Sequence, residues 1–320
     1  SYPEIDLNAR DEYGITALMI ACSEGHKDVV QSLLAHSSIE LSAKDNLGLT
    51  AFINACEYGH KDVVQLLLDH SEGNIELNAR SNIGQTAFMF ACEEGYKDVV
   101  QLLLNYPEID LNARQTDGMT AFMYACYYGH KDVVQLLLDH SEGNIELNAR
   151  SEFGQTTFLL ACAEGYKDIV QLLTNDSRID LNVPDDNGCT PLMVACLNGH
   201  SYIVQLLINC SKIDLNARAQ DGRTAFMSAC FHGLKSLIQL FLDHSSKNID
   251  FNMQDYDGMT AIMEACQNGH KDVVKLLLSH PEIELNRTDK DGNTAFHLAL
   301  LHGHMDIVQL FCDLDESESE

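Results

Sequence analysis

The sequence repeats one pattern nine times, and this periodicity constrains the fold more than any other feature. The pattern G-x-T-[APT]-[FLI]-x-x-A-C-x-x-G places a threonine at positions 16, 50, 86, 120, 156, 190, 224, 260 and 294, at spacings of 34 or 36 residues, and departs from its cysteine only at Leu300. Repetition at such a period is typical of solenoids, in which each unit packs on its neighbours. We therefore predict one stack of repeats, although a chain of 320 residues would otherwise suggest two globular domains.

Each unit is predicted to form two helices. In the third unit, Thr86 can cap a first helix that runs to Glu94, and Gly95 ends it. The segment 97–104 clusters its apolar residues on one side, as an amphipathic second helix requires. The extended stretch 109–114 then leads through a glycine turn into the next unit. One such helix pair cannot bury its own apolar face, so the units must stack.

These residues resemble the ankyrin repeat, whose pattern is close to D-x-x-G-x-T-P-L-H-x-A-x-x-x-G-H followed by a Val/Leu-rich helix. The resemblance extends to about Cys312 and implies an all-α, ankyrin-type solenoid of helix-turn-helix repeats with short β-hairpin-like fingers. It implies a repeat domain over residues 1–312, followed by an acidic tail over 313–320 that we expect to be disordered. Because residues 2–10 reproduce residues 106–114 almost letter for letter, we also expect the chain to be a piece of a longer array.

One departure from the family pattern is systematic. Methionine stands where the family has a histidine that ties the turns together by hydrogen bonds, and we expect packing against methionine to replace this role. Only His297 keeps the histidine, whereas the substituted positions are Met19, Met89, Met123, Met193, Met227 and Met263.

The charge of the chain excludes several classes of partner. Forty-eight acidic and twenty basic residues give a formal net charge of −28, which repels phosphate backbones and anionic lipid surfaces. No apolar run reaches the roughly 18 residues that a membrane span needs. We therefore predict no nucleic-acid partner and no membrane partner. The acidic excess favours either a basic partner or simply the solubility of an extended surface, and both interpretations stay open.

Most of the cysteines occupy one repeat position, directly after an alanine. Neighbouring helices pack about 8–10 Å apart, beyond the roughly 7 Å Cα separation that a disulfide allows, so successive copies should not form disulfides. We expect small, buried, reduced core residues and hence an intracellular protein, cytoplasmic or nuclear. The residues are Cys22, Cys56, Cys92, Cys126, Cys162, Cys196, Cys230 and Cys266.

No residue pattern indicates catalysis, a cofactor or a metal. Acid pairs such as Glu93 and Glu94 have no histidine or nucleophile beside them, and no phosphate-binding loop occurs. Histidine recurs once per repeat at the start of the second helix, but Tyr96 and Tyr166 replace it in two units, so we expect packing and capping rather than metal binding. We predict that the chain is not an enzyme. The histidines are His26, His60, His130, His200, His270 and His304.

The resemblance places a binding surface on the concave face of the second to fifth repeats. Residues 59–81 and 129–151 are identical, and the copies then diverge mostly in the turn and the first helix, which largely line that face in ankyrin stacks. We expect a monomer that binds an extended or helical, basic and apolar protein segment there. The aromatic side chains could instead pack between repeats, and the array could serve only as a spacer or spring. The predicted contact residues are Glu57, Tyr58, Phe90, Glu93, Glu94, Asp117, Tyr124, Tyr127, Tyr128, Glu152, Phe153 and Glu164.

The resemblance also suggests a modification. Ankyrin repeats are substrates of an oxygen-dependent asparaginyl hydroxylase, which acts on Asn in an L-x5-[DE]-Φ-N setting. Asn112, Asn216 and Asn286 lie in similar settings. The alternative is that each asparagine only stabilises its turn by hydrogen bonds to nearby backbone.

Overall fold

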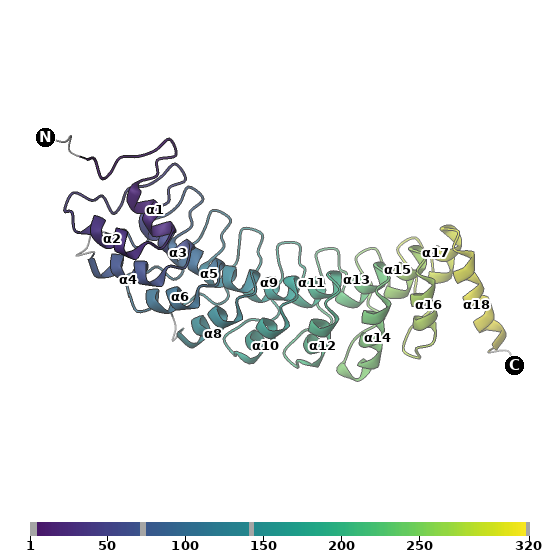
Figure 1. Cartoon of the computed structure of the whole chain (residues 1–320). Coiled ribbons are helices and arrows are strands. Elements are labelled where there is room, and N and C mark those ends of the chain that lie inside the picture. Colours follow the sequence, from purple (N-terminus) through teal and green to yellow (C-terminus); the bar gives the residue numbers. More distant parts are fainter. Residues whose placement is uncertain (1–4, 71–74, 141–143, 318–320) are drawn as a thin grey trace. The chain divides into compact units, whose positions relative to one another are not determined.

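The computed structural model describes residues 5–70, 75–140 and 144–317. The chain divides into two compact units, residues 1–153 (unit 1) and 154–320 (unit 2), each built from helix pairs in sequence order (Figure 1). Regular structure in the described residues is almost entirely α-helical, which confirms the predicted all-α class. Within the same residues, no helix combines the length and apolar character needed to cross a membrane.

Unit 1 stacks its helix pairs in two rows. The first helix of each pair contacts the first helix of the next pair, as α1 contacts α3 and α5 contacts α7, and the second helices contact one another in the same way. Its helices are α1 (Ala17–Ser23), α2 (Lys27–Leu34), α3 (Ala51–Glu57), α4 (Lys61–His70), α5 (Ala87–Glu93), α6 (Lys97–Leu103), α7 (Ala121–Tyr127) and α8 (Lys131–His140).

Unit 2 repeats this arrangement, with the odd-numbered helices in one row and the even-numbered helices in the other (Figure 1). Its helices are α9 (Thr157–Glu164), α10 (Lys167–Asn175), α11 (Pro191–Leu197), α12 (Ser201–Asn209), α13 (Ala225–Phe231), α14 (Lys235–Asp243), the short 3-10 helix η1 (Ser245–Lys247), α15 (Ala261–Gln267), α16 (Lys271–Leu278), α17 (Ala295–Leu301) and α18 (Met305–Ser317).

The repeated threonine caps the first helix in eight of the nine repeats, the exception being Thr260, and so largely as the sequence predicts. In α1 the Thr16 hydroxyl accepts the backbone N–H of Met19 at 3.3 Å, and the Thr16 N–H points back to the Met19 sulfur at 3.4 Å. In the last repeat His297 takes the same place, and its Nδ1 accepts the N–H of Thr294 at 3.2 Å. At Met19, Met193 and Met263 the methionine therefore replaces histidine as the reciprocal acceptor of the cap, and does more than the packing role that the sequence suggested.

The repeated apolar positions form the core. Phe52, Phe88 and Phe122 occupy one position of successive first helices in unit 1 and are almost fully buried. The cysteines that follow alanine are also buried, and every cysteine is a free thiol. Burial raises the pKa of Cys22 to about 12, so its thiol stays protonated. A protonated, buried thiol behaves as a small apolar core residue.

The fingers between repeats are turns rather than β-hairpins. Asp45 accepts the backbone N–H groups of Leu47 and Leu49 through its carboxylate at 2.9 and 2.8 Å, and Gly48 closes the turn with φ 81°. In the described residues β-pairing is limited to isolated bridge residues at the base of two fingers, Arg10 and Thr16 in one and Arg150 and Thr156 in the other. The finger is too short for a strand ladder, and the aspartate satisfies the backbone groups that a ladder would pair.

The histidines that begin the second helices join neighbouring repeats. The Nε2–H of His130 donates to the carbonyl of Glu93 at 2.6 Å, and His60 donates to Ser23 in the same way at 2.8 Å. At the helix starts occupied by His26, His200 and His270 the side chain makes no capping hydrogen bond, so the predicted capping role is wrong. The ring instead fills the space beside the preceding repeat's left-handed glycine, as His130 does at Gly95.

The end of the chain differs from the expectation of a disordered tail from residue 313. Helix α18 continues to Ser317, because no glycine or proline follows Gly303 to end it. Residues 318–320, the rest of the predicted tail, lie outside the described residues.

Candidate protein-binding surface

Most of the predicted contact residues of unit 1 lie at the C-terminal ends of three successive first helices. The last helical residue and the residue after it are Glu57 and Tyr58 at α3, Glu93 and Glu94 at α5, and Tyr127 and Tyr128 at α7. Because the first helices pack on one another in order, these pairs follow one another along the same row. We call this set, with Gln85 and Tyr124, the acidic–aromatic surface.

The aromatic residues of the surface differ in exposure. Tyr58 and Tyr128 are 52% and 45% exposed, whereas Phe90 is half-buried. Tyr124 is only 6% exposed and stacks on Tyr128, with ring centroids 6.3 Å apart and planes 15° apart. Tyr127 meets the same Tyr128 ring edge-on at 5.0 Å. The expectation that the Tyr124 ring offers contact area to a partner is therefore wrong, because this ring is buried and packs against Tyr128.

Glu93 is a carboxylate of this surface that other side chains of unit 1 hold in place. It is half-buried and accepts a hydrogen bond from Gln85 Nε2 at 2.5 Å and another from the Tyr128 hydroxyl. Burial raises the pKa of Glu93, and the charges of Glu94 and Asp117 add to this, while the two hydrogen bonds act in the opposite direction. A carboxylate has about four acceptor positions, so two hydrogen bonds leave it able to accept more.

The other carboxylates lie close enough to repel one another. Burial raises the pKa of Glu57, and the charges of Glu94, Glu93 and Asp45 raise it further. Over the described parts of the chain, Glu57, Glu93, Glu94 and Asp117 form no ion pair with a lysine or arginine. The surface therefore holds several negative charges beside exposed tyrosine rings without a cation from the chain itself.

An arginine–glutamate pair in unit 2 provides the contrast. Arg223 Nη2 and Nε each lie 2.8 Å from Oε1 of Glu264. Glu264 is only 1% exposed. The guanidinium also lies 3.4 Å from Asp221, 3.8 Å from Asp255 and 4.7 Å from the centroid of the Phe231 ring. Sequence reasoning missed this pair, although an arginine directly before the capping threonine, where no other repeat has a charged residue, was visible.

The finger tips contribute further predicted contacts. Glu152 donates its backbone N–H to the carbonyl of Asp117 at 2.8 Å, which joins neighbouring fingers of unit 1, and Phe153 is 67% exposed. Glu164 ends α9 in unit 2 and is exposed. Sequence reasoning missed other exposed apolar side chains in the repeat position of Phe153, and their place directly before the turn glycine was the available signal. They are Tyr13, Leu47 and Ile83.

Two of the three asparagines proposed for hydroxylation connect loops of successive repeats. The Asn112 side chain donates to the carbonyl of Asn144 at 2.7 Å and accepts the N–H of Glu146 at 2.8 Å. Asn216 makes the equivalent pair of bonds with residues 248 and 250. Asn286 is exposed. The amides thus serve inter-repeat contacts rather than their own turn, and hydroxylation stays a prediction.

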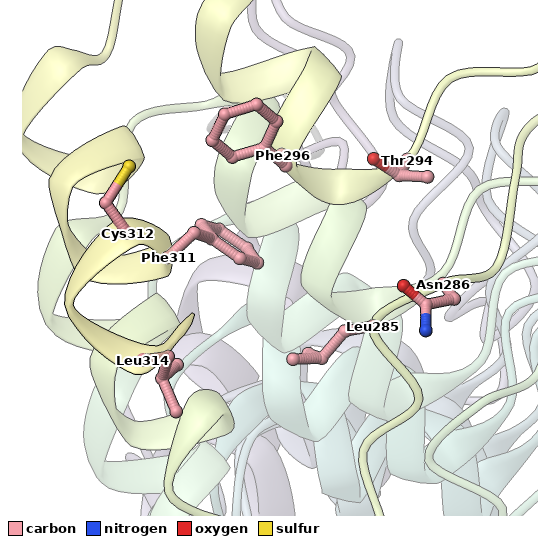
Figure 2. Close-up of a pocket in the computed structure, with 7 residues that line it drawn as sticks. All are labelled: Leu285, Asn286, Thr294, Phe296, Phe311, Cys312 and Leu314. Carbon is pink, nitrogen blue, oxygen red and sulfur yellow. The ribbon is translucent and has the colours of Figure 1, made fainter. Parts of the chain in front are cut away.

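Apolar side chains of the last two helices line a cavity of unit 2. This cavity of about 320 Å³ lies between α17, α18 and the preceding loop, and Figure 2 shows the Phe296 and Phe311 rings in its wall. Among the described residues, no group of three or more histidine, cysteine, aspartate or glutamate side chains could hold a metal ion. The complete lining of the cavity is Leu285, Asn286, Thr294, Phe296, Phe311, Cys312 and Leu314.

Comparison with known proteins places these repeats in a family. None of the curated proteins compared with the chain matches it. A family model described as ankyrin repeats (3 copies) matches residues 3–81, 73–151, 142–219, 158–255, 203–289 and 226–319. Proteins with this fold are generally protein–protein interaction modules and typically have no enzymatic activity. The overlapping matches span nearly the whole sequence, and the chain therefore belongs to the ankyrin repeat family.

Proposed function

We propose that this chain is a non-enzymatic scaffold that binds a basic and apolar segment of a partner protein on its acidic–aromatic surface. One observation carries the proposal: the carboxylates of Glu57, Glu93 and Glu94 lie together beside exposed tyrosine rings and have no cation of their own. Such charges destabilise the free protein slightly, so a cationic partner would gain from compensating them. Rigid tyrosine rings add contact area at low entropic cost.

The alternative function, a spacer or spring within a larger protein, fits this surface less well. A spacer needs contacts between repeats and a soluble exterior, but it does not need large exposed aromatic side chains. Tyr58, Tyr128 and Phe153 are each at least 45% exposed, and all three lie in unit 1. Clustered exposed apolar side chains are typical of interaction sites.

The proposal includes the remaining properties of the partner and the protein. The net charge of −28 favours a protein partner over nucleic acid or an anionic membrane, and we propose that the chain acts as a monomer. Its buried, free thiols favour an intracellular location, cytoplasmic or nuclear. Microscopy of the tagged full-length protein tests the location, and light scattering of the purified chain tests the oligomeric state.

Selection from a random peptide display library tests the binding function. With the chain as bait, we expect enriched peptides that combine arginine or lysine with aromatic or aliphatic residues. Tyr128→Ala should weaken their binding by about 1–3 kcal/mol, and added salt should slow association. Tyr202→Ala is the matched control, because Tyr202 is a tyrosine of similar exposure on α12 of unit 2, 53% against 45% for Tyr128. Peptides without cationic residues, or equal effects of both variants, would contradict the proposal.

A further inference from the structure

Four repeat positions surround the place where unit 2 holds the Arg223 guanidinium. They are the residue before the capping threonine, the last residue of that first helix, the fourth residue of the next first helix, and the residue that begins the finger between them. In unit 2 these positions are occupied by Arg223, Phe231, Glu264 and Asp255. The Arg223 cation is therefore paired with carboxylates and lies over an aromatic ring.

The same four positions in unit 1 hold similar chemistry without the cation. Gln85 stands in place of the arginine, Glu93 in place of the phenylalanine, Tyr124 in place of the glutamate and Gln115 in place of the aspartate. A carboxylate and an aromatic ring are thus both present, in exchanged positions. Gln85 is buried and donates to Glu93, but it is neutral and cannot compensate the charge.

An unsatisfied acceptor supports this comparison independently. Gln115 Oε1 is buried and has no hydrogen-bond partner, and Gln115 begins its finger with the same backbone hydrogen bond, to Met119, that Asp255 makes to Met259. In unit 2 the side chain at this position lies 3.8 Å from the guanidinium. The Gln115 amide oxygen is therefore free of protein donors at the repeat position whose side chain faces the guanidinium in unit 2.

We infer that the acidic–aromatic surface binds an arginine side chain of the partner, with its guanidinium between the carboxylates of Glu57, Glu93 and Glu94 and against the Tyr128 ring. This inference rests on the proposed function and specifies its ligand. Arginine fits better than lysine because a planar guanidinium can stack on a ring and still donate up to five hydrogen bonds in its plane. Lysine presents a strongly hydrated point charge, which gains less from the ring.

Two fluorescein-labelled peptides of equal length and charge test the inference, one alternating leucine with arginine and the other alternating leucine with lysine. Fluorescence anisotropy with the full chain should show the arginine peptide binding at least about tenfold more tightly. Gln85→Arg supplies a guanidinium from the chain itself, as Arg223 does in unit 2, and should weaken the arginine peptide about tenfold or more. Asn293→Arg places the same charge at the same repeat position of unit 2 and should leave binding unchanged.

The possible outcomes distinguish the preference for arginine from the binding function itself. Equal binding of both peptides that is lost in Tyr128→Ala would overturn the preference for arginine and leave the binding function standing. No binding of either peptide, or binding that survives Tyr128→Ala, would overturn both. If Gln85→Arg does not fold, Glu94→Gln replaces it, because Glu94 is exposed and its substitution disturbs no packing. Unchanged arginine-peptide affinity in Glu94→Gln would also overturn the inference.

Discussion

The substitution Arg223→Ala removes the cation that faces a buried carboxylate in unit 2. Glu264 is 1% exposed, and two guanidinium nitrogens lie 2.8 Å from its Oε1. Removing one partner of a buried ion pair typically costs about 3–5 kcal/mol, because the other charge stays buried without compensation. The Arg223 side chain is 32% exposed, so water can reach the carboxylate once the arginine is gone. We therefore expect a loss of about 3 kcal/mol in unfolding free energy, at the lower end of that range.

The array itself supplies a control for this substitution. Leu160 and Leu298 occupy the repeat position of Glu264 in other first helices and are buried there. The double variant Arg223→Ala, Glu264→Leu removes both charges and should recover most of the lost stability, because an apolar residue can replace a buried ion pair at little cost. Urea unfolding followed by circular dichroism measures the total change. Amide exchange in α13 and α15 measures the local change, since repeat stacks can unfold in parts.

The pH dependence gives the sign of the effect. Burial raises the pKa of Glu264 even with Arg223 present, and the arginine opposes the shift. A glutamate with a raised pKa favours folding below its unfolded pKa, and this contribution is lost as the pH rises through the folded value. The destabilisation of Arg223→Ala should therefore be largest at neutral pH and shrink in acid. A loss below about 1 kcal/mol, or a double variant as unstable as the single one, would refute this reasoning.

Three further predictions concern stability and modification. Glu93→Gln should raise the urea midpoint of unfolding at neutral pH but not in acid, because the raised pKa of Glu93 means that its charged form disfavours folding. Equal midpoints of the variant and the parent chain at neutral pH would contradict this. Thr120→Ala should cost about 1 kcal/mol in urea unfolding, because the N–H of Met123 loses its capping acceptor, and Thr120→Ser should cost much less. Peptide mass spectrometry of protein from animal cells should find a hydroxyl addition of about 16 Da at Asn286 more often than at Asn112. The reason is that the Asn112 amide is held in two inter-repeat hydrogen bonds. If no candidate asparagine carries the addition, this result would count against hydroxylation.

The sequence alone determined the repeat, its helices and its core, because these depend on local patterns. Thr86 precedes an apolar run and caps α5, and the glycine at position 95 ends the turn after it with φ 75°. The cysteine position was identified as buried because it recurs in eight of the nine first helices. Short-range spacing is enough for such predictions, since caps, left-handed turns and amphipathic faces involve residues only a few positions apart.

Only the tertiary structure decided which side chains are covered and which charges are paired. Tyr124 and Tyr128 lie four residues apart in the sequence, yet one is buried and the other exposed. Arg223 reaches Glu264 in the next repeat, whereas Gln85 at the same repeat position reaches Glu93 within its own. Exposure and ion pairing depend on how successive repeats stack, and a repeat pattern read along one chain gives the stacking partner but not the direction in which each side chain turns.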